Sequence, residues 1–360
     1  MLPLIPIVCA LSALLSPRQG APARTEVLDL EPLLAPLWEK HAVPALGGAI
    51  VTLDGLAGVG AAGMRSVDGD ADVTSADRWH LGSCTKAMTA TLVARLVEQG
   101  KMSFDTTIAS AFPGLLGEMH ADWREIPVRL LLQNRGGVSG DIEPTLWSAL
   151  WAASGPTREA RRMLVQGILS HPPAYEPDRQ NVYSNAGFAL AGAMAEAMAD
   201  KSWEELMQVE LFEPLGMDSA GFGAPGAIGA LDEPLGHTPK AAGYAPMPRG
   251  PGDDNPPAIG PAGTVHASLA SWAQFARAHL LGAKGAGEFL KPETWSRLQT
   301  PASDSGYAMG WMVVERPWAG GTALTHSGSN TMWFCTVWMA PKQGFAVLAV
   351  CNAGGDAAAA

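Results

Sequence analysis

Ser83 and Lys86 stand three residues apart in the segment Leu81-Gly82-Ser83-Cys84-Thr85-Lys86, where a predicted helix begins. Residues at this spacing share one face of a helix, which places an amine beside a hydroxyl. A lysine with a lowered pKa can take the serine proton, and the positive end of the helix favours the uncharged amine. The pattern alone is common, because a helix-capping serine followed by a solvated lysine produces it too.

Two further segments carry polar residues at positions where elements begin or end. Tyr183-Ser184-Asn185 comes directly before a helical run, and His326-Ser327-Gly328-Ser329-Asn330 lies at the end of a short strand. Each has an ordinary structural explanation: a buried tyrosine followed by helix-capping residues, and a histidine on a surface strand. Neither segment identifies a site by itself.

The elements around these segments follow a simple order of strands, then helices, then strands. Apolar spacing and the stop signal at Gly100 predict a helix from Thr85 to Glu98. Further helices are predicted at Leu28–Lys40, Val128–Leu132, Arg158–Leu169, Gly187–Met198, Ser202–Leu211 and Leu269–Leu281, and strands at Gly47–Leu53, Gly58–Met64, Ala308–Val314, Thr322–His326, Trp333–Met339 and Phe345–Val350.

One stretch, from Gly221 to Gly263, is dense in glycine and proline and lacks periodicity. Such a stretch inside a compact domain is usually a functional loop, so it is expected to border the site. The order of the other elements favours a single α/β layer interrupted by a helical insert.

Taken together and in this order, SxxK at Ser83, YxN at Tyr183 and HxG at His326 resemble the serine β-lactamase and penicillin-binding superfamily. YxN in place of SDN is similar to class C β-lactamases, D-amino-acid peptidases and family VIII esterases. The resemblance extends over most of the chain, through the segments Leu81–Ile108, Val128–Val138, Leu211–Met217 and Gly260–Gly263.

The resemblance implies a β-lactamase/transpeptidase-like α/β fold, with an antiparallel sheet flanked by helices and carrying a helical insert. One hydrolase domain would span residues 24–360, its α/β part at about 28–80 and 285–360 and its helical and loop insert at about 84–284. Members of this superfamily usually continue into a terminal helix, whereas this chain ends in four alanines. If that helix is missing, apolar sheet surface is expected to be exposed.

The resemblance also implies a role for each motif residue. Ser83 would attack an acyl carbon to form an acyl-enzyme, with Lys86 and Tyr183 shuttling the proton. Asn185 would hold the substrate amide or Lys86, and the N–H groups of Ser83 and Ser329 would bind the oxyanion. The expected substrate-binding residues are Asn185, His326, Ser327, Gly328 and Ser329.

His326 departs from the superfamily, because β-lactamases and transpeptidases carry a lysine there that favours anionic substrates, and Ser327 replaces a threonine. An unperturbed imidazole is charged only below roughly pH 6.5. We therefore expect an ester or amide hydrolase, esterase-like or D-amino-acid peptidase-like, acting on a neutral substrate. A β-lactamase proper and a catalytically inactive binding protein remain the alternatives.

Composition limits the partners and cofactors. The formal net charge of −11 argues against nucleic acid and anionic membranes, and favours a small-molecule ester, amide or peptide substrate. No CxxC or HExxH pattern occurs, so neither a metal nor another cofactor is expected. Cys335 and Cys351 would face each other in only one strand register, and no required disulfide is expected. Composition leaves open whether the protein is a monomer or a homo-oligomer.

The N-terminal run from Leu2 to Leu15 is apolar but too short to span a bilayer. Small residues follow at Ala21-Pro22-Ala23, so residues 1–23 are predicted to be a signal peptide, although no basic residue precedes the run. The expected location is periplasmic or secreted, with no stable membrane insertion after cleavage.

Overall fold

The computed structural model describes residues 26–302 and 304–359, so the expected signal peptide lies outside the described residues. Its largest feature is a seven-stranded sheet. Across the sheet the strands are β1 (Leu28–Asp29), β3 (Gly55–Gly63), β2 (Ala45–Thr52), β12 (Phe345–Cys351), β11 (Phe334–Ala340), β10 (Gly321–Ser329) and β9 (Met312–Arg316). Every pairing is antiparallel except that of β1 with β3.

The sheet joins strands from the two ends of the described chain. β2 and β3 form an early hairpin, and β12 pairs with β2 along its whole length. In the β11–β12 pair Cys335 lies opposite Val350, and Cys351 lies opposite Phe334. The two cysteines are therefore one register position apart and on opposite faces, which is the second of the two registers left open by the sequence.

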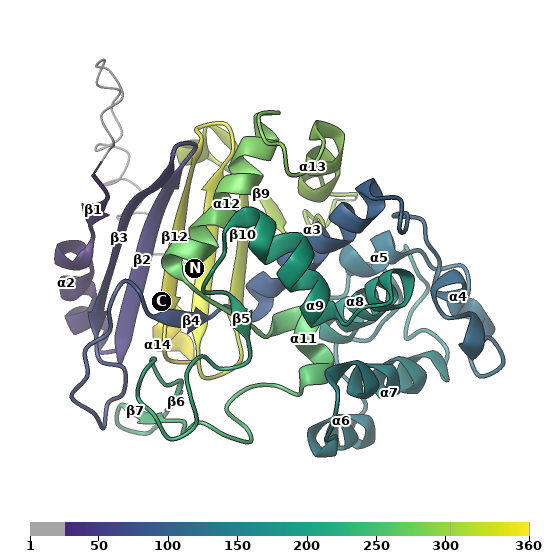
Figure 1. The fold of residues 1–360 in the computed structure, drawn as a ribbon, viewed down its shortest axis with the longest axis horizontal. Helices are drawn as coiled ribbons and strands as arrows, with labels where there is room; N and C mark the ends of the chain where they lie inside the picture. Colours follow the sequence, from purple (N-terminus) through teal and green to yellow (C-terminus); the bar gives the residue numbers. More distant parts are fainter. Residues whose placement is uncertain (1–25, 303, 360) are drawn as a thin grey trace.

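Helices cover both faces of this sheet (Figure 1). On the outer side α2 (Glu31–His41) packs against β2 and β3, with Leu34 contacting an apolar cluster that includes Ile50 and Phe345. On the inner side α12 (Leu269–Ala283) contacts β2, β3 and β12. The arrangement confirms the predicted antiparallel sheet flanked by helices.

A largely helical region lies beyond α12 (Figure 1). It comprises α3 (Thr85–Glu98), α4 (Ile108–Ala111), α5 (Val128–Leu132), α6 (Pro144–Ala152), α7 (Thr157–Leu169), α8 (Asn185–Ala199), α9 (Trp203–Met207), α10 (Glu213–Leu215), α11 (Gly260–Gly263) and α13 (Pro292–Gln299). Short 3₁₀ turns are η1 (Gly82–Cys84), η2 (Pro113–Leu115), η3 (Ala121–Trp123), η5 (Pro257–Ile259) and η6 (Pro317–Ala319), and η4 (Gln208–Phe212) is π-helical.

Two small sheets and a short last helix complete the described fold. β8 (Val265–Ser268) pairs with β4 (Arg78–His80) and β5 (Gly221–Phe222), and β6 (His237–Pro239) pairs with β7 (Tyr244–Pro246). α14 (Asp356–Ala359) contacts β11. Within the described ranges, no helix is both long and apolar enough to cross a membrane.

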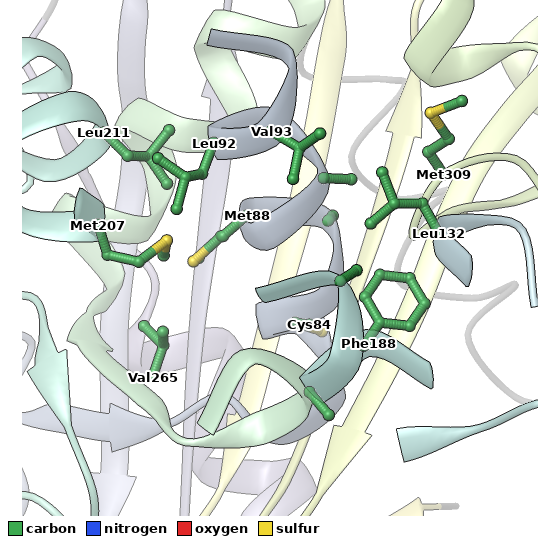
Figure 2. Close-up of a cluster of buried hydrophobic side chains, with 14 of the residues drawn as sticks. Cys84, Met88, Leu92, Val93, Leu132, Phe188, Met207, Leu211, Val265 and Met309 are labelled. Atoms are coloured by element: carbon green, nitrogen blue, oxygen red, sulfur yellow. The ribbon is translucent and has the colours of Figure 1, made fainter. Parts of the chain in front are cut away.

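The helix α3 runs through the centre of the main core. Most of its residues are buried, and Met88, Leu92 and Val93 contact side chains from several other elements, among them Phe188 of α8 and Leu211 of η4 (Figure 2). At its end the N–H of Gly100 bonds to Val97 and that of Lys101 bonds to Leu96. This Schellman arrangement explains why the predicted limits of the helix are confirmed.

Several predicted boundaries differ from the structure: the strand predicted at Thr322–His326, for example, extends to Ser329. Two other differences have clear local reasons. The first predicted helix starts at Glu31 instead of Leu28, because Leu28 and Asp29 pair with β3. The strand predicted at Ala308–Val314 begins at Met312, because Gly310 has a positive φ of 84° within a turn that closes between Ala308 and Trp311.

Candidate active site

Ser83 lies where strand β4 turns into the helix α3. It is the second residue of η1, which continues directly into α3, and the residue is half-buried. The first N–H groups of a helix have no partner within it, so the Ser83 N–H is free of helical hydrogen bonding. The turn presents both the hydroxyl and the N–H of one residue at a helix start.

Lys86 is fully buried one turn along and contacts three oxygens. Its Nζ donates to Ser83 Oγ at 3.0 Å, to Asn185 Oδ1 at 2.7 Å and to the carbonyl of Ala262 at 2.8 Å. Burial lowers the pKa of Lys86 to about 7, and the electrostatic influence of Cys84 acts against this shift. A substantial share of Lys86 is therefore neutral at physiological pH.

The hydrogen-bond partners of Lys86 suit a neutral amine that acts as a base better than a charged ammonium in a salt bridge. Neither Asn185 Oδ1 nor the Ala262 carbonyl carries a net charge, and each accepts one hydrogen. A neutral amine has two hydrogens and one lone pair, so these two acceptors leave the lone pair for the Ser83 hydroxyl. The arrangement can remove a proton from Ser83 without moving a side chain.

Tyr183 lies on the other side of this amine. Its ring centroid is 4.6 Å from Lys86 Nζ, and Ser83 lies close enough to influence the pKa of its hydroxyl. The residue as a whole is 43% exposed, but the surroundings of the hydroxyl are crowded, and burial raises the pKa of Tyr183 well above 10. The phenol thus stays protonated near neutral pH, where it can donate and relay a proton but is a poor base.

The other two residues of this motif hold the segment in place. Ser184 is the N-cap of α8, since its Oγ accepts from the N–H of Gly187 at 3.0 Å. The N–H of Ser184 also donates to Asn134 Oδ1 at 3.1 Å. Asn185 is then the first residue of α8, which directs its amide to Lys86.

The strand β10 comes unusually close to the Ser83 turn through two glycines. A Cβ on Gly82, which has a φ of 44°, would lie 2.4 Å from Ser329 N. A Cβ on Gly328 would lie 2.1 Å from the Leu81 carbonyl and 2.8 Å from Ser83 N. Only glycine permits this approach, which brings the backbone N–H groups of Ser83 and Ser329 close together.

His326 is buried on β10 and is already hydrogen-bonded on both sides. Its Nδ1 donates to the carbonyl of Ser327 at 2.7 Å, and its Nε2 lies 3.5 Å from the hydroxyl of Tyr307. Since a carbonyl only accepts, Nδ1 carries the hydrogen and Nε2 can accept from Tyr307 in the neutral ring. The tyrosine is itself buried, which raises its pKa far above 10 and keeps it a donor.

Of the remaining predicted residues, Ser327 and Ser329 are exposed on β10, and the Ser327 hydroxyl donates to Thr336 Oγ1 at 3.2 Å. Cys84, the neighbour of Ser83, is buried, and its Sγ lies 3.4 Å from Cys335 Sγ, on the core side of the turn. In residues 26–302 and 304–359 no cluster of three or more His, Cys, Asp or Glu could hold a metal ion.

The sequence did not identify the role of the segment from Pro261 to Val265. Three hydrogen bonds dock it on α3: Lys86 to the Ala262 carbonyl, Thr89 Oγ1 to the Pro261 carbonyl at 2.7 Å, and the Val265 N–H to Thr85 Oγ1 at 3.1 Å. The only sequence signal was the motif Gly260-Pro261-Ala262-Gly263 at the end of the irregular stretch. Main-chain acceptors such as Ala262 leave no trace in residue type.

The chain is similar to several known proteins. A family model described as Beta-lactamase matches residues 30–360. Penicillin-binding protein 4 of Amycolatopsis lactamdurans is 26% identical over 331 residues, covering 88% of this chain and 82% of that protein. Lovastatin esterase of Penicillium rubens is 27% identical over 162 residues, covering 41% of this chain and 40% of the esterase. The crystal structure of SurE has a TM-score of 0.73 at 24% identity, covering 89% of this chain and 71% of that one.

Proposed function

Because this chain belongs to the beta-lactamase family, we propose that it is a serine hydrolase that forms an acyl-enzyme on Ser83 with a neutral ester or amide. The observation that carries the proposal is the contact of Ser83 Oγ with a buried Lys86 whose pKa is lowered to about 7. A serine hydroxyl is a weak nucleophile, and an adjacent base that takes its proton activates it.

The reaction follows from the groups around Ser83. Lys86 takes the Ser83 proton as Oγ attacks the acyl carbon, and the N–H groups of Ser83 and Ser329 receive the oxyanion. The proton passes from Lys86, through the Tyr183 hydroxyl, to the leaving group as the bond to the acyl carbon breaks. Water then attacks the acyl-enzyme with the same groups working in reverse, releasing the acid and restoring Ser83.

Lys86 is the base in this scheme and Tyr183 the relay. The two candidates differ in the direction of their pKa shifts: burial lowers the pKa of Lys86 to about 7 and raises that of Tyr183. Catalytic bases work best when their pKa lies near the working pH, which favours the lysine.

The neutral substrate is supported by His326. With Nδ1 donating to the Ser327 carbonyl and Nε2 beside the Tyr307 hydroxyl, the ring has no free N–H with which to bind a carboxylate. A lysine at this position would supply such a cation. An ester or amide without a carboxylate near the scissile bond therefore fits the site best. One relative, the lovastatin esterase, is named for an ester substrate.

Intact-mass spectrometry tests the nucleophile. The wild-type chain, Ser83→Ala and Cys84→Ala are incubated with a fluorophosphonate, p-nitrophenyl butyrate and nitrocefin. We expect a covalent adduct on the wild type and on Cys84→Ala, and none on Ser83→Ala. A folded wild-type chain without an adduct contradicts the proposal and favours an inactive binding protein. Turnover of nitrocefin above that of the ester favours a β-lactamase.

A pair of chromogenic esters tests the substrate class. 2-Nitrophenyl butyrate and 3-butanoyloxy-4-nitrobenzoate differ only by a carboxylate on the leaving group. We expect kcat/KM to be at least roughly tenfold higher for the neutral ester, which corresponds to about 1.4 kcal/mol. His326→Lys should narrow this ratio by binding the carboxylate. Equal rates for both esters in the wild type would exclude the preference.

A further inference from the structure

His80, Asp254 and Asn330 form a buried chain of hydrogen bonds beside the proposed oxyanion donors. They come from three separate segments: the end of β4, the irregular stretch between β7 and η5, and the residue after β10. The side chain of His80 is 0% exposed and that of Asp254 is 8% exposed. The proposed reaction assigns no role to any of the three.

The hydrogen bonds define one arrangement of protons. The N–H of Gly82 donates to His80 Nδ1 at 3.1 Å, so this nitrogen carries no hydrogen. His80 Nε2 then holds the hydrogen and donates to Asp254 Oδ2 at 2.9 Å. The other carboxylate oxygen, Oδ1, accepts from Asn330 Nδ2 at 3.1 Å and from the N–H of Asn255 at 2.7 Å.

Each end of this chain is adjacent to a proposed oxyanion donor. Gly82 directly precedes Ser83, and Asn330 directly follows Ser329. Gly82 also occupies the position where the two backbones approach most closely, since a Cβ there would lie 2.4 Å from Ser329 N. Asp254 therefore connects, through one side chain on each side, the two backbone segments whose separation defines the oxyanion site.

We propose that Asp254 is a positioning residue that, through His80 and Asn330, fixes the distance and direction of the Ser83 and Ser329 N–H groups toward the oxyanion. The inference rests on the proposed hydrolase function. Preorganised donors lose their effect when they are displaced by a fraction of an ångström, and a single carboxylate that accepts from both sides resists such displacement. Through Asp254, the irregular stretch from Gly221 to Gly263 would also help to position the oxyanion donors.

Asp254→Asn tests the link with minimal change of shape. Both carboxylate oxygens of Asp254 accept hydrogen bonds, one from His80 and the other from Asn330. In Asp254→Asn one of these oxygens is replaced by an amide nitrogen, which only donates. That nitrogen must then face another donor, so one of the two hydrogen bonds is lost. Glu233→Gln is the matched control. Glu233 also belongs to the irregular stretch and also anchors β4, by accepting from the N–H and Nε of Arg78 at 2.7 Å each. Unlike Asp254, it makes no hydrogen bond to the β10 segment.

The measurement compares p-nitrophenyl butyrate with its thiono ester, in which sulfur replaces the carbonyl oxygen. Sulfur accepts hydrogen bonds weakly, so the thiono ester gains little from the oxyanion donors. We expect Asp254→Asn to lower kcat for the oxygen ester roughly tenfold to a hundredfold, with KM within about threefold. Because the thiono ester depends little on the oxyanion donors, its kcat should change less, so the ratio of oxygen-ester kcat to thiono-ester kcat should fall in Asp254→Asn. Glu233→Gln should leave that ratio unchanged.

The outcomes separate the inference from the function on which it rests. A wild-type chain that shows neither turnover nor a Ser83 adduct overturns both. An active wild type with an unchanged ratio in Asp254→Asn, or with equal falls in both variants, overturns the inference alone. If Asp254→Asn does not fold, His80→Asn makes the same comparison, because asparagine keeps an acceptor for the Gly82 N–H but does not reach Asp254.

Discussion

At the scale of single residues, the environment of Lys86 determines the chemistry. A buried ammonium is costly, and this lysine has no acidic partner among its three hydrogen bonds. Its pKa is accordingly lowered to about 7, so the amine becomes neutral as the pH rises through that value. The state that can accept the Ser83 proton is therefore present above pH 7 and lost below it.

The pH dependence of acylation follows from the direction of this pKa shift. We expect kcat/KM for p-nitrophenyl butyrate to rise with pH, to bend near pH 7 and to level off above it. Lys86→Arg should lower the rate by roughly 10² to 10⁴, because a guanidinium does not deprotonate in this range. Stopped-flow rates between pH 5.5 and 9 check the profile, and a flat wild-type curve would contradict the assignment of Lys86 as base.

Tyr183 offers the complementary test. Because burial raises its pKa, its loss should remove a relay and leave the base in place. Tyr183→Phe is expected to lower kcat by about tenfold to a hundredfold while the bend near pH 7 persists. If the bend disappears in Tyr183→Phe and survives in Lys86→Arg, the roles of the two residues are reversed.

At the scale of elements, the contact between β10 and the η1 turn is the most sensitive. It depends on Gly328, where a Cβ would lie 2.1 Å from the Leu81 carbonyl. Neither partner can yield easily, because β10 is paired with β11 at this position and the turn continues into the buried helix α3. The site thus tolerates no side chain at this point.

Gly328→Ala should therefore lower kcat by about a hundredfold or more, since the Ser83 and Ser329 donors must separate. Gly114→Ala is the control, because a Cβ at Gly114 would meet nothing within 4 Å. Ester hydrolysis, with circular dichroism to verify folding, distinguishes the two. Unchanged kcat in a folded Gly328→Ala variant would show that the close approach is unimportant for catalysis.

The helices and strands differ in how well they can be predicted from the sequence. Long elements with clear periodicity, such as α3, were predicted with correct limits, and the motif residues Ser83, Lys86 and Asn185 do meet. β4 and β8 were not predicted, because three or four residues are too few to display a period of two. The His80–Asp254 contact spans 174 positions and ends in a stretch without periodicity, so no local pattern announces it.

At the scale of the whole molecule, one core unites the sheet and the helical region. Leu348 of β12, Phe188 of α8 and Leu206 of α9 all belong to a single cluster of contacting buried residues. The early hairpin and the late strands share one sheet through the β2–β12 pair. The helical insert and the α/β part are therefore expected to unfold together.

Leu348→Ala measures this coupling. The side chain is 0% exposed, and truncating a fully buried leucine costs about 3 kcal/mol. We expect the urea midpoint to fall to the same extent by tryptophan fluorescence and by far-ultraviolet circular dichroism. Two separated transitions, with only one of them shifted, would show that the regions unfold independently.

The position of β12 also has a consequence for biosynthesis. β12 is the last described strand in the chain but lies between β2 and β11, so the early hairpin has no neighbour on that side until β12 leaves the ribosome. Pairings of such long sequence separation form slowly and leave strand edges open in the meantime. The Ser83 turn is synthesised well before its partner strand β10. The nascent chain therefore carries its proposed nucleophile without the oxyanion donor of Ser329 until β10 has been made, and a holdase chaperone that covers the β2 edge until β12 is available should increase the yield of active protein.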